Sequence, residues 1–74
     1  MSEIKVGQIR EYFDDILITT HIESTKDRGY IVDCIYKDGI VNEITYSYLE
    51  DSKLIAEYPT WQEAANSPEF KGDK

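Results

Sequence analysis

The chain has 74 residues, 41% of them apolar, and 15 acidic against 8 basic side chains give it a net charge of −7. This size predicts a single small domain over residues 1–74, with an ordered core of about residues 4–70, and the apolar content excludes a disordered chain. The charge argues against direct binding of DNA or RNA, because phosphates would be repelled and the basic residues are scattered along the chain.

The first third of the chain predicts a β-hairpin. Residues 6–13 carry apolar side chains near alternate positions, residues 16–23 are rich in β-branched residues, and Asp14-Asp15 between them is typical of a turn. Alternation should place the even-numbered residues of the second strand on one face of the sheet and the odd-numbered residues on the other.

A second hairpin is predicted over residues 30–37 and 40–46. Asp38-Gly39 between these segments is the strongest hairpin signal in the chain, because this pair tolerates the backbone angles of a tight turn. Residues 53–58 predict a fifth strand.

The C-terminal segment contains the clearest helix signal and the only Trp. Thr60 stands where an N-cap residue belongs, and Glu63 follows three residues later, which is the spacing of a capping box. Trp61, Ala64 and Ala65 would then form one apolar stripe that docks on the sheet.

Two further helical turns are predicted. Residues 47–50 repeat the capping-box spacing but are few, so they fit a single turn before the fifth strand. Ser67-Pro68-Glu69 predicts another turn, because Pro suits the first helical position, and this turn would return Phe70 to the core.

These elements together predict a mainly β (α+β) fold. Five short antiparallel strands, with a helical turn before the fifth, are typical of a small SH3-like barrel, and a strongly bent sheet is the alternative. Closing the sheet into a barrel would remove its exposed edges. The short C-terminal helix would cover an open end or one face.

The sequence contains no catalytic motif, and we predict a protein that is not an enzyme. His21 and Cys34 could in principle form a base and a nucleophile, but the expected roles are a solvent-facing histidine and a small buried apolar side chain. Adjacent acid pairs fall in predicted turns, where Asp is favoured for local backbone reasons. One Cys and one His cannot close a zinc site, so no metal and no cofactor are expected.

The single Cys also bears on the compartment, because it excludes an internal disulfide and indicates a reducing environment. No apolar run approaches the ~20 residues of a membrane span. The N-terminus lacks the basic and apolar regions of a signal peptide. The expected localisation is the cytoplasm, without membrane contact.

Acidic residues in the last third of the chain predict a surface that binds a partner. Rows of carboxylates on a rigid scaffold can imitate the phosphates of a duplex, so a basic DNA-binding protein would bind this domain in place of DNA. The acidity could instead serve solubility alone. The residues expected in the acidic surface are Glu50, Asp51, Glu57, Glu63 and Glu69.

The six tyrosines support an alternative function. Aromatic side chains can line a groove for a peptide, and the chain would then be an SH3-like adaptor or assembly module that binds a peptide or a protein subunit. A homodimer is compatible with either function.

The segments from Tyr58 to Ala64 (YPTWQEA) and from Asn66 to Phe70 (NSPEF) resemble the C-terminus of small proteins encoded by phages and prophages of Gram-positive bacteria. In size and acidity the chain is also similar to host-takeover proteins of lytic phages, among them acidic DNA mimics that occupy the DNA-binding site of the histone-like protein HU. This resemblance implies an inhibitor that sequesters a basic nucleoid protein in the host cytoplasm. It transfers no binding residue.

Overall fold

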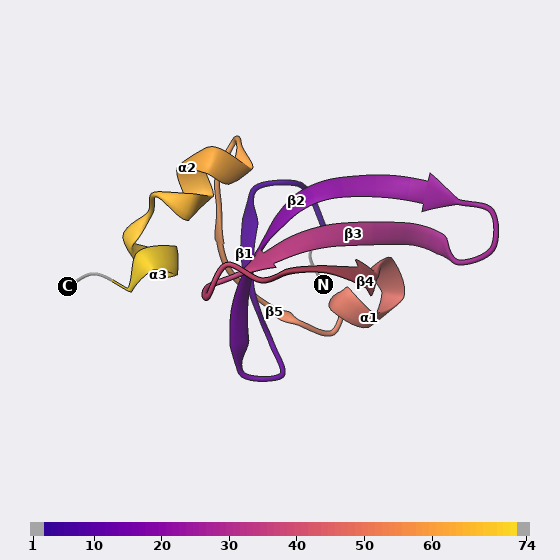
Figure 1. The fold of residues 1–74 in the computed structure, drawn as a ribbon, viewed down its shortest axis with the longest axis horizontal. Coiled ribbons are helices and arrows are strands. Elements are labelled where there is room, and N and C mark those ends of the chain that lie inside the picture. The colour runs from indigo at the N-terminus through magenta and orange to yellow at the C-terminus, as the bar shows by residue number, and fades with distance from the viewer. Residues whose placement is uncertain (1–2, 73–74) are drawn as a thin grey trace.

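The computed structural model describes residues 3–72 of the chain. Five strands form one antiparallel sheet in the order β4-β3-β2-β1-β5, and three short helices pack against it (Figure 1). The predicted mainly β fold with five antiparallel strands is confirmed. The elements in chain order are β1 (Gln8–Tyr12), β2 (Asp15–Thr25), β3 (Gly29–Tyr36), β4 (Val41–Thr45), α1 (Tyr46–Leu49), β5 (Lys53–Glu57), α2 (Trp61–Ala65) and α3 (Pro68–Lys71).

The sheet is open, with β4 and β5 as its edges, so the bent sheet is observed and the closed barrel is not. Each edge departs from a regular ladder. On β4, Asn42 Oδ1 accepts the backbone N–H of Glu43 at 2.9 Å. On β5, the pairing with β1 shifts register between Ile9 and Arg10. Both features make the edges poorer templates for a further strand.

The first hairpin forms, but its turn lies one residue earlier than predicted. Tyr12 pairs with Asp15, so the turn consists of residues 13–14, whose φ angles are 53° and 68°. Positive φ at both central positions defines the two-residue turn that matches the twist of a hairpin. β1 also begins two residues later than predicted, after Gly7, whose φ angle of 94° interrupts the strand.

The strict alternation predicted for β2 is wrong beyond its middle. A register shift between Thr19 and His21 places Leu17 and Ile22 in contact with the same core. An extra residue in one strand of a pair exchanges the faces of all residues that follow it. Such a bulge depends on pairing with the neighbouring strand and leaves no local signal in the sequence.

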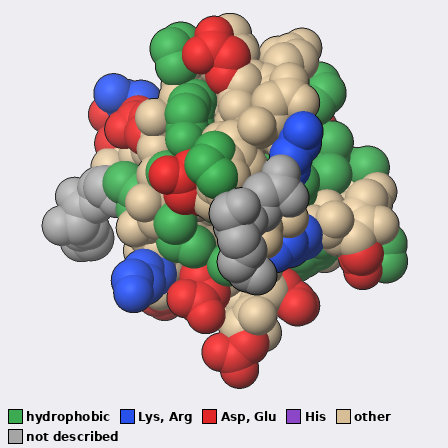
Figure 2. All heavy atoms as spheres, turned by 90° about the vertical axis from the view of Figure 1, so that its left-hand side faces the viewer, with side chains coloured by type: hydrophobic (Ala, Val, Ile, Leu, Met, Phe, Trp, Pro, Cys, Tyr) green, Lys and Arg blue, Asp and Glu red, His purple; other side chains and the backbone are tan. Residues whose placement is uncertain are grey.

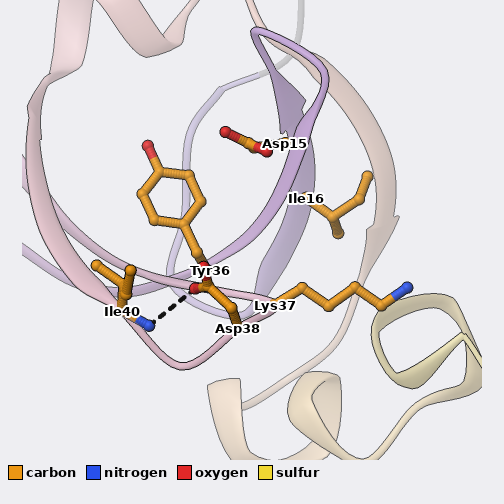
Figure 3. A pocket seen from close by; sticks show the side chains of 6 residues that line it. All are labelled: Asp15, Ile16, Tyr36, Lys37, Asp38 and Ile40. Atoms are coloured by element: carbon orange, nitrogen blue, oxygen red, sulfur yellow. Dashed lines mark hydrogen bonds between the residues drawn. The ribbon is translucent and has the colours of Figure 1, made fainter.

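The second hairpin is confirmed across Asp38-Gly39. The N–H of Gly39 donates to the carbonyl of Tyr36 at 2.8 Å, and the N–H of Ile40 donates to Asp38 Oδ1 at 3.1 Å (Figure 3). Because Ile40 belongs to this turn, β4 starts one residue later than predicted, at Val41.

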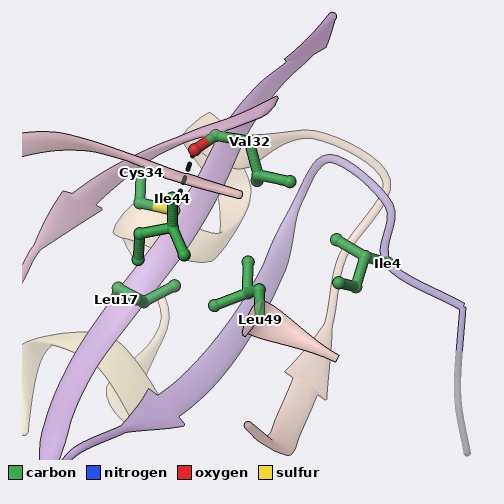
Figure 4. Packing of buried hydrophobic residues seen from close by; sticks show 6 residues of the cluster. All are labelled: Ile4, Leu17, Val32, Cys34, Ile44 and Leu49. Carbon is green, nitrogen blue, oxygen red and sulfur yellow. Dashed lines mark hydrogen bonds between the residues drawn. The ribbon is translucent and has the colours of Figure 1, made fainter. Parts of the chain in front are cut away.

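An inner core lies on one face of the bent sheet. Ile4 reaches it from the N-terminal segment. The backbone N–H of Ile4 donates to the hydroxyl of Tyr46 at 3.2 Å. Leu49 reaches it from α1. These two side chains therefore cover part of the face that the open sheet exposes. Figure 4 shows the six buried residues of the inner core: Ile4, Leu17, Val32, Cys34, Ile44 and Leu49.

An outer core lies on the opposite face, beneath α2 and α3. Ile9 and Ile18 from the sheet meet Ala64 and Phe70 from the helices, and Trp61 packs against this cluster. The predicted docking of the Trp61 stripe and the return of Phe70 to the core are both confirmed. The sheet is thus buried on both faces where β1 and β2 pair.

The helix starts agree with the local signals at two of three places. Thr60 Oγ1 accepts the backbone N–H of Glu63 at 3.2 Å, and Pro68 is the first residue of α3. α1 starts one residue earlier than predicted, after Thr45, whose side chain makes no capping bond. The chain enters α1 directly from β4, so Ser47 already lies inside the helix and cannot cap it.

Replacing Trp61 with Ala is expected to lower the free energy of unfolding by about 2–3 kcal/mol, below the usual range for a fully buried aromatic because Trp61 is half-buried. The matched change Tyr48→Ala, at an α1 side chain that is 64% exposed, should change it by less than about 0.5 kcal/mol. Urea unfolding followed by circular dichroism measures both. Equal midpoints for the two variants would contradict the docking role of Trp61.

Candidate protein-interaction surface

The five acids predicted to bind a partner are all exposed, but they occupy separate places. Glu50 and Asp51 follow α1, and Glu57 ends β5. Glu63 lies on α2 and Glu69 on α3. Figure 2 views the α2–α3 end of the molecule, where acidic side chains alternate with basic and apolar ones and do not form one row.

Glu57 faces away from the two C-terminal helices. Its neighbours Ala56 and Tyr58 pack against the outer core, so alternation directs Glu57 to the opposite face. There it is the Cα partner of Gln8, and its charge acts on Arg10. Glu57 therefore does not share a face with the acids of α2 and α3.

Tyr58 and Glu69 connect the end of β5 to α3. The hydroxyl of Tyr58 donates to Glu69 Oε1 at 2.5 Å. This bond raises the pKa of Tyr58 and lowers the pKa of Glu69, because it favours the neutral phenol and the charged carboxylate. Glu69 is thus an anion with one oxygen engaged within the fold.

A concentration of acidic side chains surrounds the turn between β1 and β2. A hollow of about 150 Å³ lies between this turn and the residues after α1. The hollow is lined by Glu11, Tyr12, Phe13, Asp51 and Ser52. Lys53, the Cα partner of Glu11, is the base that strand pairing places beside these acids. We define the tip surface as Glu11, Phe13, Asp14, Asp15 and Asp51.

Of the tip surface, the sequence predicts partner binding for Asp51 alone. It predicts Asp14-Asp15 as the turn itself, one residue from the observed turn. The contact between the turn and the residue after α1 joins segments far apart in the chain, so no local pattern predicts it. The local signal in the sequence is an aromatic residue, Phe13, directly before two predicted turn acids.

Arg10 supports the tip surface from the inner face, where its side chain is 1% exposed. Its Nε donates to Gln8 Oε1 at 2.8 Å, and its Nη1 donates to the carbonyl and the hydroxyl of Ser52 at 3.2 and 3.1 Å. Burial lowers the pKa of Arg10, because the charged form loses solvation. Arg10 thereby ties the segment after α1 to β1.

A second acidic group lies toward the far ends of β2, β3 and β4. Strand pairing places His21, Asp33 and Glu43 in one row across the sheet. His21 Nε2 lies 3.5 Å from Glu23 Oε1, and Arg28 Nη2 lies 3.7 Å from Glu43 Oε1. The Arg28–Glu43 ion pair offsets part of the negative charge of the second group.

His21 and Cys34 lie on opposite faces of the sheet. The side chain of His21 is 60% exposed, whereas Cys34 is buried in the inner core and donates its thiol to the carbonyl of Val32 at 3.6 Å (Figure 4). Burial raises the pKa of Cys34 to about 12. The expected placement of both residues is confirmed, and the structure does not bring them together as a nucleophile and a base.

The pKa of Cys34 predicts a loss of stability at alkaline pH. The thiol ionises at a lower pH in the unfolded chain, near its ordinary value of 9.0, than in the fold, at about 12. The contribution of the buried thiol to the free energy of unfolding is therefore complete below pH ~9 and is lost as the pH rises toward ~12. Urea unfolding of the wild type and of Cys34→Ala at neutral and alkaline pH should show a smaller pH dependence in the variant. Identical pH dependence would contradict this prediction.

Two tyrosines line an open hollow at another part of the inner face. The rings of Tyr30 and Tyr46 have centroids 6.1 Å apart. With Glu3, Ile4 and Ile22 they border a space of about 470 Å³. We call these five residues the tyrosine groove, because aromatic and apolar side chains of this kind line the grooves of peptide-binding domains.

A further hollow of about 350 Å³ lies between the start of β2 and the β3–β4 turn. Figure 3 shows Asp15 and Tyr36 on one side of it, while Lys37 extends away toward the C-terminal helices, where its Nζ lies close to Gly72. The lining contains no His or Cys.

No family model, curated protein or solved structure matches the chain. Within residues 3–72, no three His, Cys, Asp or Glu side chains are grouped so that they could hold a metal ion. No helix in the same range combines the length and the apolar character that a membrane span requires. The tip surface and the tyrosine groove are the two surfaces from which a function can be inferred.

Proposed function

We propose that the chain is a non-enzymatic module that binds a basic protein through its acidic surface. The observation that supports this most directly is the imbalance of exposed charge, 12 acids against 6 bases among residues 3–72. The exposed acids are Glu3, Asp14, Asp15, Glu23, Asp27, Asp38, Glu43, Glu50, Asp51, Glu57, Glu63 and Glu69. The exposed bases are Lys5, Lys26, Arg28, Lys37, Lys53 and Lys71.

The amount of charge limits how the module could imitate DNA. Residues 3–72 contain 14 acids and 7 bases, and this difference of −7 over a longest dimension of 42 Å is one net charge every 6 Å. B-DNA carries one charge per ~1.7 Å of its axis. A mimic of this composition must therefore use a local concentration of acids. The tip surface provides one, with Glu11 and Asp51 at its hollow and Asp14 and Asp15 at the adjoining turn.

A basic DNA-binding protein is the partner class that fits such a surface. The carboxylates would occupy the Lys and Arg side chains that otherwise bind phosphates, so DNA and the module would exclude each other. The resemblance to phage proteins suggests the nucleoid protein HU as the partner and the host cytoplasm as the compartment. The module would then act as a phage-encoded inhibitor.

The tyrosine groove supports a second candidate function, an SH3-like adaptor or assembly module. Tyr30 and Tyr46 present aromatic surface beside Ile22, with Glu3 at the border. A peptide held there would depend on one or two tyrosines and little on salt, because burial of apolar surface is screened far less than exposed charge.

A competition titration distinguishes the two functions. The chain is added to HU that holds a labelled DNA duplex, at low and at physiological salt. We expect DNA to be displaced, and displacement to weaken at physiological salt, where charges are screened over about 8 Å. Binding of DNA and the chain to HU at the same time, without salt dependence, would rule out mimicry. If Tyr30→Ala then abolished that binding, the groove would be the site.

Two matched triple variants test the sign of the electrostatic effect. Single exposed ion pairs contribute only about 0–1 kcal/mol, so three charges are changed together. Neutralising three acids should weaken binding, and neutralising three bases should strengthen it. A loss of binding in both variants would indicate damage to the fold. The acidic variant is Asp14→Asn, Asp15→Asn and Asp51→Asn, three exposed acids of the tip surface, and the basic variant is Lys26→Gln, Lys53→Gln and Lys71→Gln.

A further inference from the structure

Phe13 is the most exposed large apolar side chain of the described residues, at 83%. It occupies the first position of the β1–β2 turn, where φ is 53°. Bulky side chains are rare at positive φ, and Asn, Asp or Gly usually stand there. Neither folding of the turn nor burial in the core accounts for a phenylalanine at this position. Figure 1 shows this turn projecting from the body of the molecule, away from the α2–α3 end.

The ring of Phe13 has a rigid support. It meets the ring of Tyr12 edge to face, with centroids 4.6 Å apart and planes at 69°. Tyr12 itself packs against the inner core. Across the hollow, Ser52 is held by Arg10 and donates its hydroxyl to the carbonyl of Leu49 at 2.5 Å. An aromatic side chain held in this way loses little freedom when it binds, which favours affinity.

Two acidic side chains share the hollow of this ring, and two more follow it in the chain. Glu11 and Asp51 line the same hollow as Phe13, and Asp14 and Asp15 follow Phe13 in the chain. Interfaces commonly centre on a buried aromatic anchor with polar groups at the rim. Because the side chains around Phe13 are acidic, a complementary partner carries basic side chains around an apolar patch that contacts the ring.

We propose that Phe13 is the apolar anchor of the tip surface and that it binds a basic amphipathic segment, in which Lys or Arg side chains border apolar surface. This inference rests on the proposed function and narrows the chemistry of its partner. Imitation of phosphates alone requires no apolar contact, so the anchor separates this mode of binding from simple charge mimicry.

A second copy of the chain is a poor occupant of the tip surface. Each copy has a net charge of −7, and each tip surface is acidic, so two tips would repel one another. A basic partner from outside the chain meets both the charge and the apolar requirement.

Two peptides with the same number of lysines test the inference, namely a lysine homopeptide and a helical peptide with lysines on one face and leucines on the other. Phe13→Asn removes the ring, keeps the charge and suits positive φ, so its unfolding midpoint should equal or exceed that of the wild type. Phe13→Gly is a second variant of the same kind. Asp14→Asn is the matched control, because it keeps the ring and removes one charge.

The wild type should bind the leucine-containing peptide about tenfold or more tightly than the homopeptide. Phe13→Asn should lose this preference and retain its affinity for the homopeptide. Asp14→Asn should weaken binding of both peptides by less than about fivefold.

Four results would overturn the inference. No preference in the wild type, or a preference that survives Phe13→Asn, would refute the anchor while leaving the proposed function intact. Failure to bind either peptide would refute the proposed function and the inference together. Self-association of the wild type in sedimentation that Phe13→Asn abolishes would assign the ring to contact between copies.

Discussion

Replacing Gly7 with Ala is expected to lower the free energy of unfolding by about 3–5 kcal/mol, the sum of backbone strain and a steric clash. A Cβ at this position would lie 2.3 Å from the carbonyl oxygen of Tyr58, which is a backbone atom and cannot rotate away. The carbonyl of Gly7 also accepts the N–H of Tyr58 at 2.9 Å, and its N–H donates to the carbonyl of Thr19 at 2.9 Å. The clash therefore acts where β5 leads into α2.

Gly39 is a matched control for the Gly7 substitution. Its φ angle is also 94°, but a Cβ there would meet no atom within 4 Å. Gly39→Ala should therefore show the strain alone, about 1–2 kcal/mol. Urea unfolding followed by circular dichroism gives both values. If the two substitutions cost the same, the close approach of Tyr58 to Gly7 would be of no energetic consequence.

Replacing Arg10 with Ala is expected to lower the free energy of unfolding by about 3–5 kcal/mol, because a large buried side chain and its hydrogen bonds are lost together. The buried oxygen of Gln8 and the carbonyl of Ser52 would each lose a charged donor. Arg10→Lys should recover only part of this loss, because an ammonium cannot reproduce the planar fork of a guanidinium.

Arg28 provides the comparison for Arg10. Its ion pair with Glu43, at 3.7 Å, is exposed on both sides. Arg28→Ala should therefore change the free energy of unfolding by less than about 1 kcal/mol. A similar cost for both arginines in urea unfolding would show that the buried bonds to Gln8 and Ser52 add nothing to stability.

The Arg10 variants also bear on binding. Ser52 lines the tip hollow and is held by Arg10, so Arg10→Lys should loosen the tip surface without changing its charge. Arg10→Lys should weaken the preference for the leucine-containing peptide and also lower the free energy of unfolding. Phe13→Asn should remove the same preference without lowering the free energy of unfolding. The two variants together separate the anchor from its support.

Local sequence signals predicted the elements correctly where one short segment contained the whole interaction. Asp38-Gly39 supplied the turn of the second hairpin, and Thr60 capped α2 through the N–H of Glu63. Trp61 docked on the sheet as its spacing predicted. For the turn and the cap, the interacting atoms lie within a few residues of one another in the chain. For Trp61, an apolar stripe on a helix can dock on the apolar face of a sheet whatever the detailed register of the strands.

Pairing between distant strands decided what these signals could not. The register shift between Thr19 and His21 exchanged the faces of β2, and the turn moved to Phe13 and Asp14 against ordinary turn preferences. The open sheet likewise reflects the pairing of β1 with both β2 and β5, which leaves β4 as a free edge. Each of these depends on packing summed over many residues.

The amino-acid sequence alone determined the class of fold, two of the three helix starts and the excess of negative charge, because these follow from local backbone chemistry and composition. The arrangement of that charge was decided only by tertiary structure. Strand alternation turned Glu57 away from Glu63 and Glu69, and the segment after α1 brought Asp51 beside Phe13. Neighbours in the chain can lie on opposite faces of a sheet, whereas residues far apart in the chain can border one hollow.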